Sequence, residues 1–341
     1  MMNRTKTKIA VIAAILVMAG FTSCGETLAE LEFNSSKTMV TDVANRDKNP
    51  TKAVIPEGVK VIGDRAFSFC RSLKSVTIPS SVKVIGRGAF SECDSLASVT
   101  LPEGVEEIGI RAFSECKSLK SVTIPSSVKV IGENAFYECK SLKSVTIPGS
   151  VEKIDREAFD GCESLASVTI GNGVKVIGGG AFSGCKALTS VTIPEGVEVI
   201  ELGAFSGTGL TSISIPNSVK KLAGFGYTPL TSITIPGSVE VIGSRAFQNC
   251  KSLESVEIPE GVEIIDEQAF ESCDMLESVT IPASVEAIGG AAFDRCTLLR
   301  SVKFHGTKAQ WQAIRKPRNH YTSIGTFAVQ CTDGELPSQK W

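Results

Sequence analysis

The spacing of apolar residues along the chain repeats every 23 residues. Phenylalanine marks this period most clearly, with intervals of 23 except for 20 and 22 on the two sides of Phe225. Such self-similarity predicts a solenoid in which each repeat forms one coil and stacks on the next. Eleven copies span roughly residues 53–304, with phenylalanines at Phe67, Phe90, Phe113, Phe136, Phe159, Phe182, Phe205, Phe225, Phe247, Phe270 and Phe293.

Each copy contains one segment that predicts a β-strand. In Leu-x-Ser-Val-Thr-Ile-Pro, as at residues 119–125, apolar and polar residues alternate with a period of two. This alternation is what a half-buried strand requires, and Val, Ile and Thr favour strands. Equivalent strands one repeat apart would stack in parallel about 4.8 Å apart. The sequence therefore predicts a β-rich solenoid, a curved ribbon with a continuous core.

The predicted core can be followed around one coil. Its inward positions are Leu73, Val76, Ile78, Val82, Ile85, Phe90 and Cys93. A glycine follows most of the repeat isoleucines, and we expect these glycines to form tight corners with a positive φ. The first four are Gly63, Gly86, Gly109 and Gly132. The Ala-Phe-x-x-Cys segment fits either a single helical turn on the convex side or a loop.

The whole repeat resembles that of a known family. The pattern Leu-x-Ser-Val-x-Ile-Pro-x-Ser-Val-x-x-Ile-Gly-x-x-Ala-Phe-x-x-Cys is similar to the leucine-rich repeats of the bacterial surface family called BspA-type, over about three quarters of the chain. Residues 302–311 are similar to the segment that often closes such arrays. The resemblance implies a right-handed leucine-rich repeat coil with a parallel sheet on the concave face. It also implies export and lipid anchoring in a host-associated bacterium, with some relatives binding matrix proteins or other cells.

Residues 1–23 have the features of a lipoprotein-type signal peptide. A basic start without acidic residues precedes an apolar or small run at 9–20, which is shorter than the ~20 residues of a membrane-spanning helix. The next residues, Phe-Thr-Ser-Cys, resemble a lipobox, although phenylalanine departs from the usual leucine. We therefore expect cleavage before Cys24 and a lipid anchor on that cysteine. The alternative is an ordinary secreted protein with an incidental cysteine.

These patterns divide the chain into four segments. The signal peptide occupies residues 1–23, and residues 24–52 form a tether and N-terminal cap. The array of about eleven repeats spans residues 53–304, and residues 305–341 form a C-terminal cap and tail. Caps are expected because the end coils of a solenoid would otherwise expose the core.

Nine of the eleven cysteines occupy the same position of the repeat. They are Cys70, Cys93, Cys116, Cys139, Cys162, Cys185, Cys250, Cys273 and Cys296. Stacked Cα atoms near 5 Å apart would permit disulfides, but the odd number and the absence of built-in pairs favour buried free thiols. A metal site is disfavoured because the sulfur atoms spread along a line instead of converging on a point. Cys331, outside the array, is either free or a reactive thiol.

Composition restricts the possible functions further. Thirty-five basic and thirty-seven acidic residues give a formal charge of −2, which provides no basic footprint for nucleic acid. The only histidines are His305 and His320, both near the C-terminus, so general-base and metal chemistry have few candidates. A nucleophile elbow, a phosphate loop and a dinucleotide fingerprint are missing in their required contexts. We expect no enzyme activity, no cofactor and no metal.

The strand face that points away from the core is the predicted ligand surface. One column of this face, one residue after the repeat leucine, changes from basic through neutral to acidic. Its charged members are the candidate ligand contacts: Lys74, Lys120, Lys143, Glu254, Glu277 and Arg300. The alternative is a solvated charge ladder. A second column, which includes Lys83 and Glu106, alternates in sign and is expected to pair across neighbouring coils.

The irregular stretch at residues 206–229 supplies one more candidate contact. Here two repeats shorten, the cysteine is missing and Tyr227 appears. Recognition often lies where a loop varies on a rigid scaffold. The alternative is a deletion that is merely tolerated on the convex side.

The sequence as a whole favours a protein-binding role. We expect an exported protein, lipid-anchored at the outer membrane or cell surface, that adheres to host matrix proteins or to other cells. Many weak contacts along the repeat surface would hold the ligand, and charge would orient it. The alternative is a lipid-anchored scaffold that faces the periplasm and has no host ligand.

Overall fold

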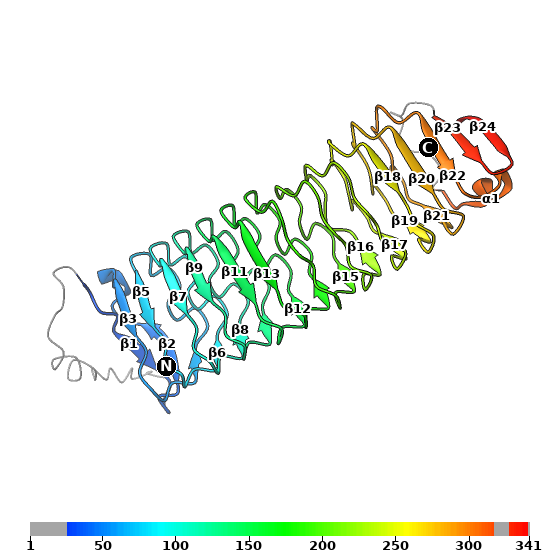
Figure 1. The fold of residues 1–341 in the computed structure, drawn as a ribbon. Coiled ribbons are helices and arrows are strands. Elements are labelled where there is room, and N and C mark those ends of the chain that lie inside the picture. The colour runs from blue at the N-terminus through cyan, green and yellow to red at the C-terminus, as the bar shows by residue number, and fades with distance from the viewer. Residues whose placement is uncertain (1–25, 317–326, 340–341) are drawn as a thin grey trace, which may run out of the picture.

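The 23-residue period folds into coils that stack along one axis. A computed structural model describes residues 26–316 and 327–339, and Figure 1 shows the coils lying side by side from one end of an elongated molecule to the other. Parallel strands from successive coils pair with each other, which confirms the predicted β-solenoid. The signal peptide and Cys24 lie outside the described residues.

The predicted strands form parallel sheets in register. Val145 lies opposite Val168 and Ser144 opposite Ser167, so equivalent residues of neighbouring coils pair directly. Between Ser167–Ile170 and Ser255–Glu257 the sheet is reduced to isolated bridges, such as Thr169 with Thr192. These strands are β3 (Lys52–Val54), β5 (Ser75–Thr77), β7 (Ser98–Thr100), β9 (Ser121–Thr123), β11 (Ser144–Ile147), β13 (Ser167–Ile170), β18 (Ser255–Glu257), β20 (Ser278–Ile281) and β22 (Ser301–Phe304).

A second strand in each coil builds the longest sheet, which has 13 strands. These strands were not predicted, because two residues are too few to show an alternating pattern. In each pair the second residue is buried, as Ile177 and Ile200 are. The strands are β4 (Val61–Ile62), β6 (Val84–Ile85), β8 (Glu107–Ile108), β10 (Val130–Ile131), β12 (Lys153–Ile154), β14 (Val176–Ile177), β15 (Val199–Ile200), β16 (Lys221–Leu222), β17 (Val241–Ile242), β19 (Ile264–Ile265) and β21 (Ala287–Ile288).

Stacked phenylalanine rings run through the core from Phe67 to Phe293. Neighbouring ring centroids lie between 4.9 Å (Phe67 and Phe90) and 6.0 Å (Phe225 and Phe247) apart. Interplanar angles range from 4° to 15°, so the rings are stacked rather than edge-on. The predicted inward residues of the traced coil are buried, except that Val76 is only half-buried. Each coil therefore completes its core by packing against its neighbours.

The segment that contains Ala-Phe-x-x-Cys is a series of turns and not a helix. We call residues 63–73 and their equivalents the turn segment, and the side of the solenoid that they form the turn face. Arg65 and Phe69 have φ values of 56° and 62°, which no right-handed helical turn contains. The intervening Phe67 N–H donates to Ala89 O of the next coil at 2.8 Å. Of the two predicted alternatives, the loop is correct.

The glycines after the repeat isoleucines serve close packing between coils, and the predicted positive φ is wrong for them. Gly63, Gly86, Gly109 and Gly132 do not adopt a positive φ. A Cβ on Gly86 would lie 2.7 Å from Ile62 O, and one on Gly132 would lie 2.7 Å from Ile110 N. Hydrogen is therefore the only substituent that fits against the neighbouring backbone.

The cysteine column consists of free, buried thiols, as predicted. Each thiol from Cys93 onward contacts a phenylalanine carbonyl of the preceding coil; Cys116 Sγ, for example, donates to Phe90 O at 3.1 Å. Burial raises the pKa of Cys70 to about 11 and that of Cys116 to about 12. Thr208 and Thr228 take this position in the two shortened repeats, where their hydroxyls donate to Phe205 O and Phe225 O.

Antiparallel strands close the array near both ends of the described chain. At the N-terminal end, β1 (Leu31–Phe33) pairs with β2 (Met39–Val43), which joins the long sheet through β4, and η1 (Arg46–Lys48) follows. At the C-terminal end, β23 (Phe327–Cys331) pairs with β22 in parallel and with β24 (Gly334–Gln339) in antiparallel orientation. Between β22 and β23 in the sequence lies α1 (Lys308–Ala313). The ring of its Trp311 packs edge-on against that of Phe304, with 5.2 Å between the ring centroids.

Gly132→Ala should destabilise the solenoid. We expect the free energy of unfolding to fall by about 1–3 kcal/mol, because the new methyl group must displace backbone of the preceding coil. Gly149→Ala is the matched control, since its Cβ would meet no atom closer than 3.8 Å. Urea unfolding followed by circular dichroism measures both variants. Equal midpoints for the two would contradict the packing role.

Thiol labelling should separate the column from Cys331. In a Cys24→Ala variant, a water-soluble disulfide reagent at pH 8 should label Cys331, which is half-buried, and spare the nine buried thiols. The thiolate is the reactive form, and burial disfavours it in the core. In denaturant all ten should react. Mass spectrometry of the peptides identifies which cysteines are labelled. Rapid labelling of Cys139 in the native protein would show that the cysteine column is accessible to solvent and would contradict the prediction.

Candidate ligand-binding face

The predicted strands carry short polar side chains in columns on their exposed side; these strands are β5, β7, β9, β11, β13, β18, β20 and β22. We call this side the Ser-Val-Thr face. In β11, Ser144 and Thr146 are exposed whereas Val145 is 3% exposed and points into the core. Because the register places Ser144 opposite Ser167 and Thr146 opposite Thr169, each side chain stacks on its equivalent in the next coil. The face is therefore a regular grid on which only a few positions vary.

The predicted basic contacts lie along one edge of this face. Lys74, Lys120 and Lys143 are exposed, each immediately before a strand. Lys143 N–H donates to Lys120 O at 3.2 Å, so these two lysines come from adjacent coils. Among the residues that the structure describes, no carboxylate lies within 4.0 Å of any of the three ammonium groups. Their charges are available to a ligand.

The predicted contacts of opposite sign occupy the same column nearer the C-terminus. Glu277 N–H donates to Glu254 O at 2.9 Å, and Arg300 N–H donates to Glu277 O at 3.2 Å, so the three stack in sequence. All three side chains are exposed. The Arg300 guanidinium donates to Thr297 O at 2.9 Å, which holds it over its own coil. The column thus runs from basic to acidic and ends on one arginine.

Tyr227 lies apart from the other candidates. It belongs to the turn segment, at the position equivalent to Phe69, with φ 60° and 58% exposure. Its backbone N–H donates to Gln248 O of the next coil at 2.7 Å. The structure therefore places Tyr227 on the turn face and brings only the six charged candidates together on the Ser-Val-Thr face.

The alternating column forms some of its predicted pairs. Lys83 lies 3.9 Å from Glu106, and Lys220 lies 3.4 Å from Glu240. About half of each of these four side chains is exposed, so each pair contributes only ~0.2–1 kcal/mol. These pairs stabilise the stack slightly and leave little charge for binding.

Metal sites and membrane-spanning helices are not found in the described parts of the chain. Between residues 26 and 316 and between 327 and 339, no group of three or more His, Cys, Asp or Glu side chains could hold a metal ion. Over the same ranges, no helix is long and apolar enough to cross a membrane.

The turn face gathers three arginines that sequence reasoning missed: Arg65, Arg87 and Arg111. They fall at two different positions of the repeat, since Arg87 precedes by one residue the position that Arg65 and Arg111 share. Only a comparison of every column of the repeat would have found them.

Comparison with known families identifies the repeat. The model of the BspA type leucine-rich repeat region matches residues 38–166, 106–225 and 223–329, in six copies. These ranges together include the whole array, with both of its shortened repeats. No curated protein matches the sequence significantly.

Solved structures resemble the chain over most of its length. A leucine-rich cell surface protein of Faecalibacterium prausnitzii is 29% identical, with a TM-score of 0.52, over 86% of this chain and 97% of its own. A leucine-rich repeat protein of Bacteroides ovatus is 26% identical, with a TM-score of 0.49, over 89% and 100% of the two chains. The pneumococcal vaccine antigen PcpA is 18% identical, with a TM-score of 0.51, over 84% and 81%, and shows the fold alone.

Charge removal at the lysine edge should leave the fold unchanged. The triple variant Lys74→Gln, Lys120→Gln, Lys143→Gln loses no ion pair, and its side chains are exposed. We therefore expect a free energy of unfolding within about 0.5 kcal/mol of the parent. Thermal unfolding by circular dichroism measures it. A larger loss would mean that the column is a structural ladder.

Proposed function

The chain belongs to the BspA-type leucine-rich repeat family, and from this premise we propose that it is an exported, surface-exposed binding module for a protein ligand. Its ligand lies along the Ser-Val-Thr face and is a host matrix protein or a protein on another cell. Leucine-rich repeat solenoids are typically binding scaffolds, because their stacked coils offer an extended surface. We propose no catalytic role for this one.

Uncompensated charge on the strand face is the observation that carries the proposal. Lys74, Lys120 and Lys143 present three positive charges along one edge, with no carboxylate partner among the described residues. Farther along, Glu254 and Glu277 present negative charges in the same column. Exposed charges that are not used in internal pairs are free to attract a ligand of complementary pattern. Such charges raise association rates and fix orientation more than they raise affinity.

The neutral part of the face contributes contact area. Between the two charged regions the column is occupied by Ala166, Thr189, Thr211 and Thr231, and the neighbouring columns are serine and threonine. Short side chains lose little conformational freedom when a ligand covers them. A long ligand could therefore be held by many weak contacts, with affinity that depends on simultaneous engagement.

Anchoring at Cys24 would hold the protein at a membrane, and in this proposal the Ser-Val-Thr face lies on the outer surface of the cell. The proposal rests on the lipobox-like sequence at 21–24 and on the Faecalibacterium relative, which is named a cell surface protein. Diacylation gives stable membrane attachment, whereas a single chain gives marginal attachment. Of residues 24–52, those that form β1 and β2 belong to the N-terminal cap, so the tether would be the short stretch that precedes them.

Binding should depend on the lysine edge. We expect the variant Lys74→Gln, Lys120→Gln, Lys143→Gln to bind its matrix ligand about tenfold more weakly, mainly through slower association. The effect should shrink in about 0.5 M salt, where charges are screened. Biolayer interferometry against immobilised fibronectin, laminin and collagen gives rates for each. The matched control is Lys60→Gln, Lys129→Gln, Lys175→Gln, which removes the same charge from another column.

Protease shaving of whole cells separates the two possible locations. Intact cells should lose the repeat region while a periplasmic marker survives. Loss only after lysis would place the protein inside the envelope and support the periplasmic scaffold. A failure of every matrix protein to bind, together with surface exposure, would exclude matrix adhesion and leave other cells as the target.

A further inference from the structure

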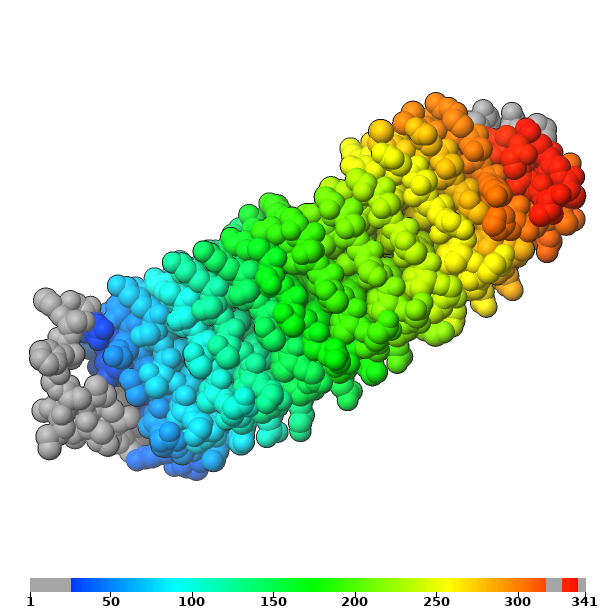
Figure 2. All heavy atoms as spheres, in the orientation of Figure 1, coloured from blue at the N-terminus to red at the C-terminus, as the bar shows by residue number. Residues whose placement is uncertain are grey.

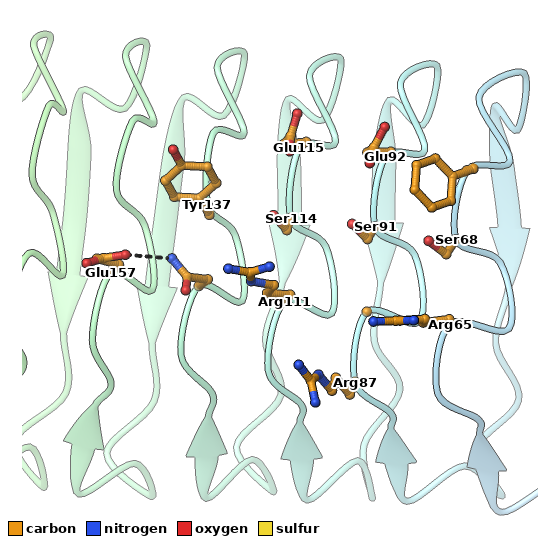
Figure 3. Close-up of a pocket in the computed structure, with 13 residues that line it drawn as sticks. Arg65, Ser68, Arg87, Ser91, Glu92, Arg111, Ser114, Glu115, Tyr137 and Glu157 are labelled. Carbon is orange, nitrogen blue, oxygen red and sulfur yellow. Dashed lines mark hydrogen bonds between the residues drawn. The ribbon is translucent and has the colours of Figure 1, made fainter.

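A hollow of about 450 Å³ lies on the turn face near the N-terminal end of the array. Five successive coils, those of Phe67 to Phe159, line it. Figure 3 shows its side chains in front of the strands, with the three arginines and Glu157 along one side, the serines in the middle, and Glu92 and Glu115 along the other. The hollow is therefore separate from the Ser-Val-Thr face, and a ligand bound in it would be independent of the function proposed for that face.

The arginine side of the hollow carries uncompensated positive charge. Arg65, Arg87 and Arg111 come from three consecutive coils, and all are exposed. No carboxylate of the described residues lies within 4.0 Å of their guanidinium groups. Arg65 extends beside Gly88, where a Cβ would lie 3.4 Å from its Cγ.

The carboxylates of the hollow are occupied by other partners. Arg71 lies 2.9 Å from Glu92, and Lys117 lies 3.6 Å from Glu115. Neither cation belongs to the arginine row. Both cations also contact Asp94. Among the described residues, the three guanidinium groups of the hollow are therefore the charges that no ion pair uses.

Glu157, at the far end of the hollow, is held in the same way. Asn134 donates to it at 3.0 Å and Arg156 lies 2.9 Å away. The hydrogen bond from Asn134 lowers the pKa of Glu157, and the nearby charges of Arg156 and Arg111 add to the effect. This carboxylate is an ionised acceptor for a ligand hydroxyl at neutral pH.

Hydroxyl groups and two aromatic rings complete the lining. Ser68, Ser91 and Ser114 form a row at the floor of the hollow, where Ser91 is half-buried and Ser68 and Ser114 are buried. None of their hydroxyls makes a hydrogen bond among the described residues. Phe69, which is 51% exposed, stands at one end, and Tyr137 stands three coils away. Free hydroxyls donate and accept hydrogen bonds, and aromatic faces pack against the C–H faces of sugar rings. The lining suits a ligand that is rich in hydroxyls and carries negative charge.

We propose that this hollow binds an extended acidic polysaccharide with a carboxylate on successive sugar residues. Arginine binds carboxylates through paired hydrogen bonds. Arg65 and Arg111 share one position of the repeat and lie two coils apart, whereas Arg87, from the coil between them, is displaced to one side. An extended polyuronate presents carboxylates on one side at every second or third sugar, which suits two arginines on alternate coils. An extended acidic peptide fits less well, because it has no ring hydroxyls to offer to Glu157 and to the serines.

Polygalacturonate is the test ligand for the full chain. We expect measurable binding by isothermal titration calorimetry, and an affinity at least about tenfold lower in the variant Arg65→Gln, Arg87→Gln, Arg111→Gln, since three charge-assisted contacts are lost. Glutamine suits this backbone: Gln268, at the position equivalent to Arg65 and Arg111, has φ 57°. Circular dichroism of the variant confirms that it remains folded.

The control removes equal charge from the opposite face. Lys74→Gln, Lys120→Gln, Lys143→Gln should leave polygalacturonate affinity unchanged. Equal losses in both triple variants would mean general attraction of a polyanion and would overturn the proposal, as would no binding by the parent. If polyglutamate binds as tightly as polygalacturonate, the polysaccharide proposal is overturned and an acidic peptide becomes the ligand class. Neutral dextran should not bind.

Discussion

The spacing of about 5 Å between coils is the constraint on which the rest of the molecule depends. Parallel strands fix it at about 4.8 Å, and the stacked phenylalanine rings of the core adopt nearly the same separation, from 4.9 Å upward. The turn segments add a third set of coil-to-coil hydrogen bonds, such as Phe67 N–H to Ala89 O. An isolated coil would make none of these hydrogen bonds or ring contacts, so the stability of each coil depends on its neighbours.

The same spacing converts sequence variation into surface pattern. Equivalent residues of successive coils lie side by side. A substitution of an exposed residue therefore changes one position of a regular surface array and leaves the backbone unaltered. The lysines of the Ser-Val-Thr face and the arginines of the turn face both use this property. Figure 2 shows the result as a long, continuous surface without a deep cleft on the side in view. Extended ligands suit such a surface better than compact ones do.

The 23-residue period and the alternation of apolar and polar residues were sufficient to predict the solenoid, the parallel strands and the buried cysteine column. The second strand was missed because two residues such as Val84 and Ile85 carry no period. The role of Gly132 was misjudged because a sequence does not show which backbone approaches a glycine from the next coil. The six charged candidates lie together beside the strands because they share one position of the repeat, and their role in binding stays a prediction. The group of three arginines was not predicted, because Arg87 is offset by one repeat position from Arg65 and Arg111 and no single column contains all three.

The strands at the ends of the sheets affect how whole molecules meet one another. Coils with matching strands at about 5 Å intervals have the geometry of a growing fibril, in which each free edge is a template for the next chain. Here β1 at one end of the long sheet, and β24 at the opposite end of the molecule, run antiparallel to their neighbours. An arriving parallel strand would meet a backbone of reversed direction. At these two edges the repeat of parallel strands is therefore interrupted, which disfavours its continuation into a second molecule in the same register.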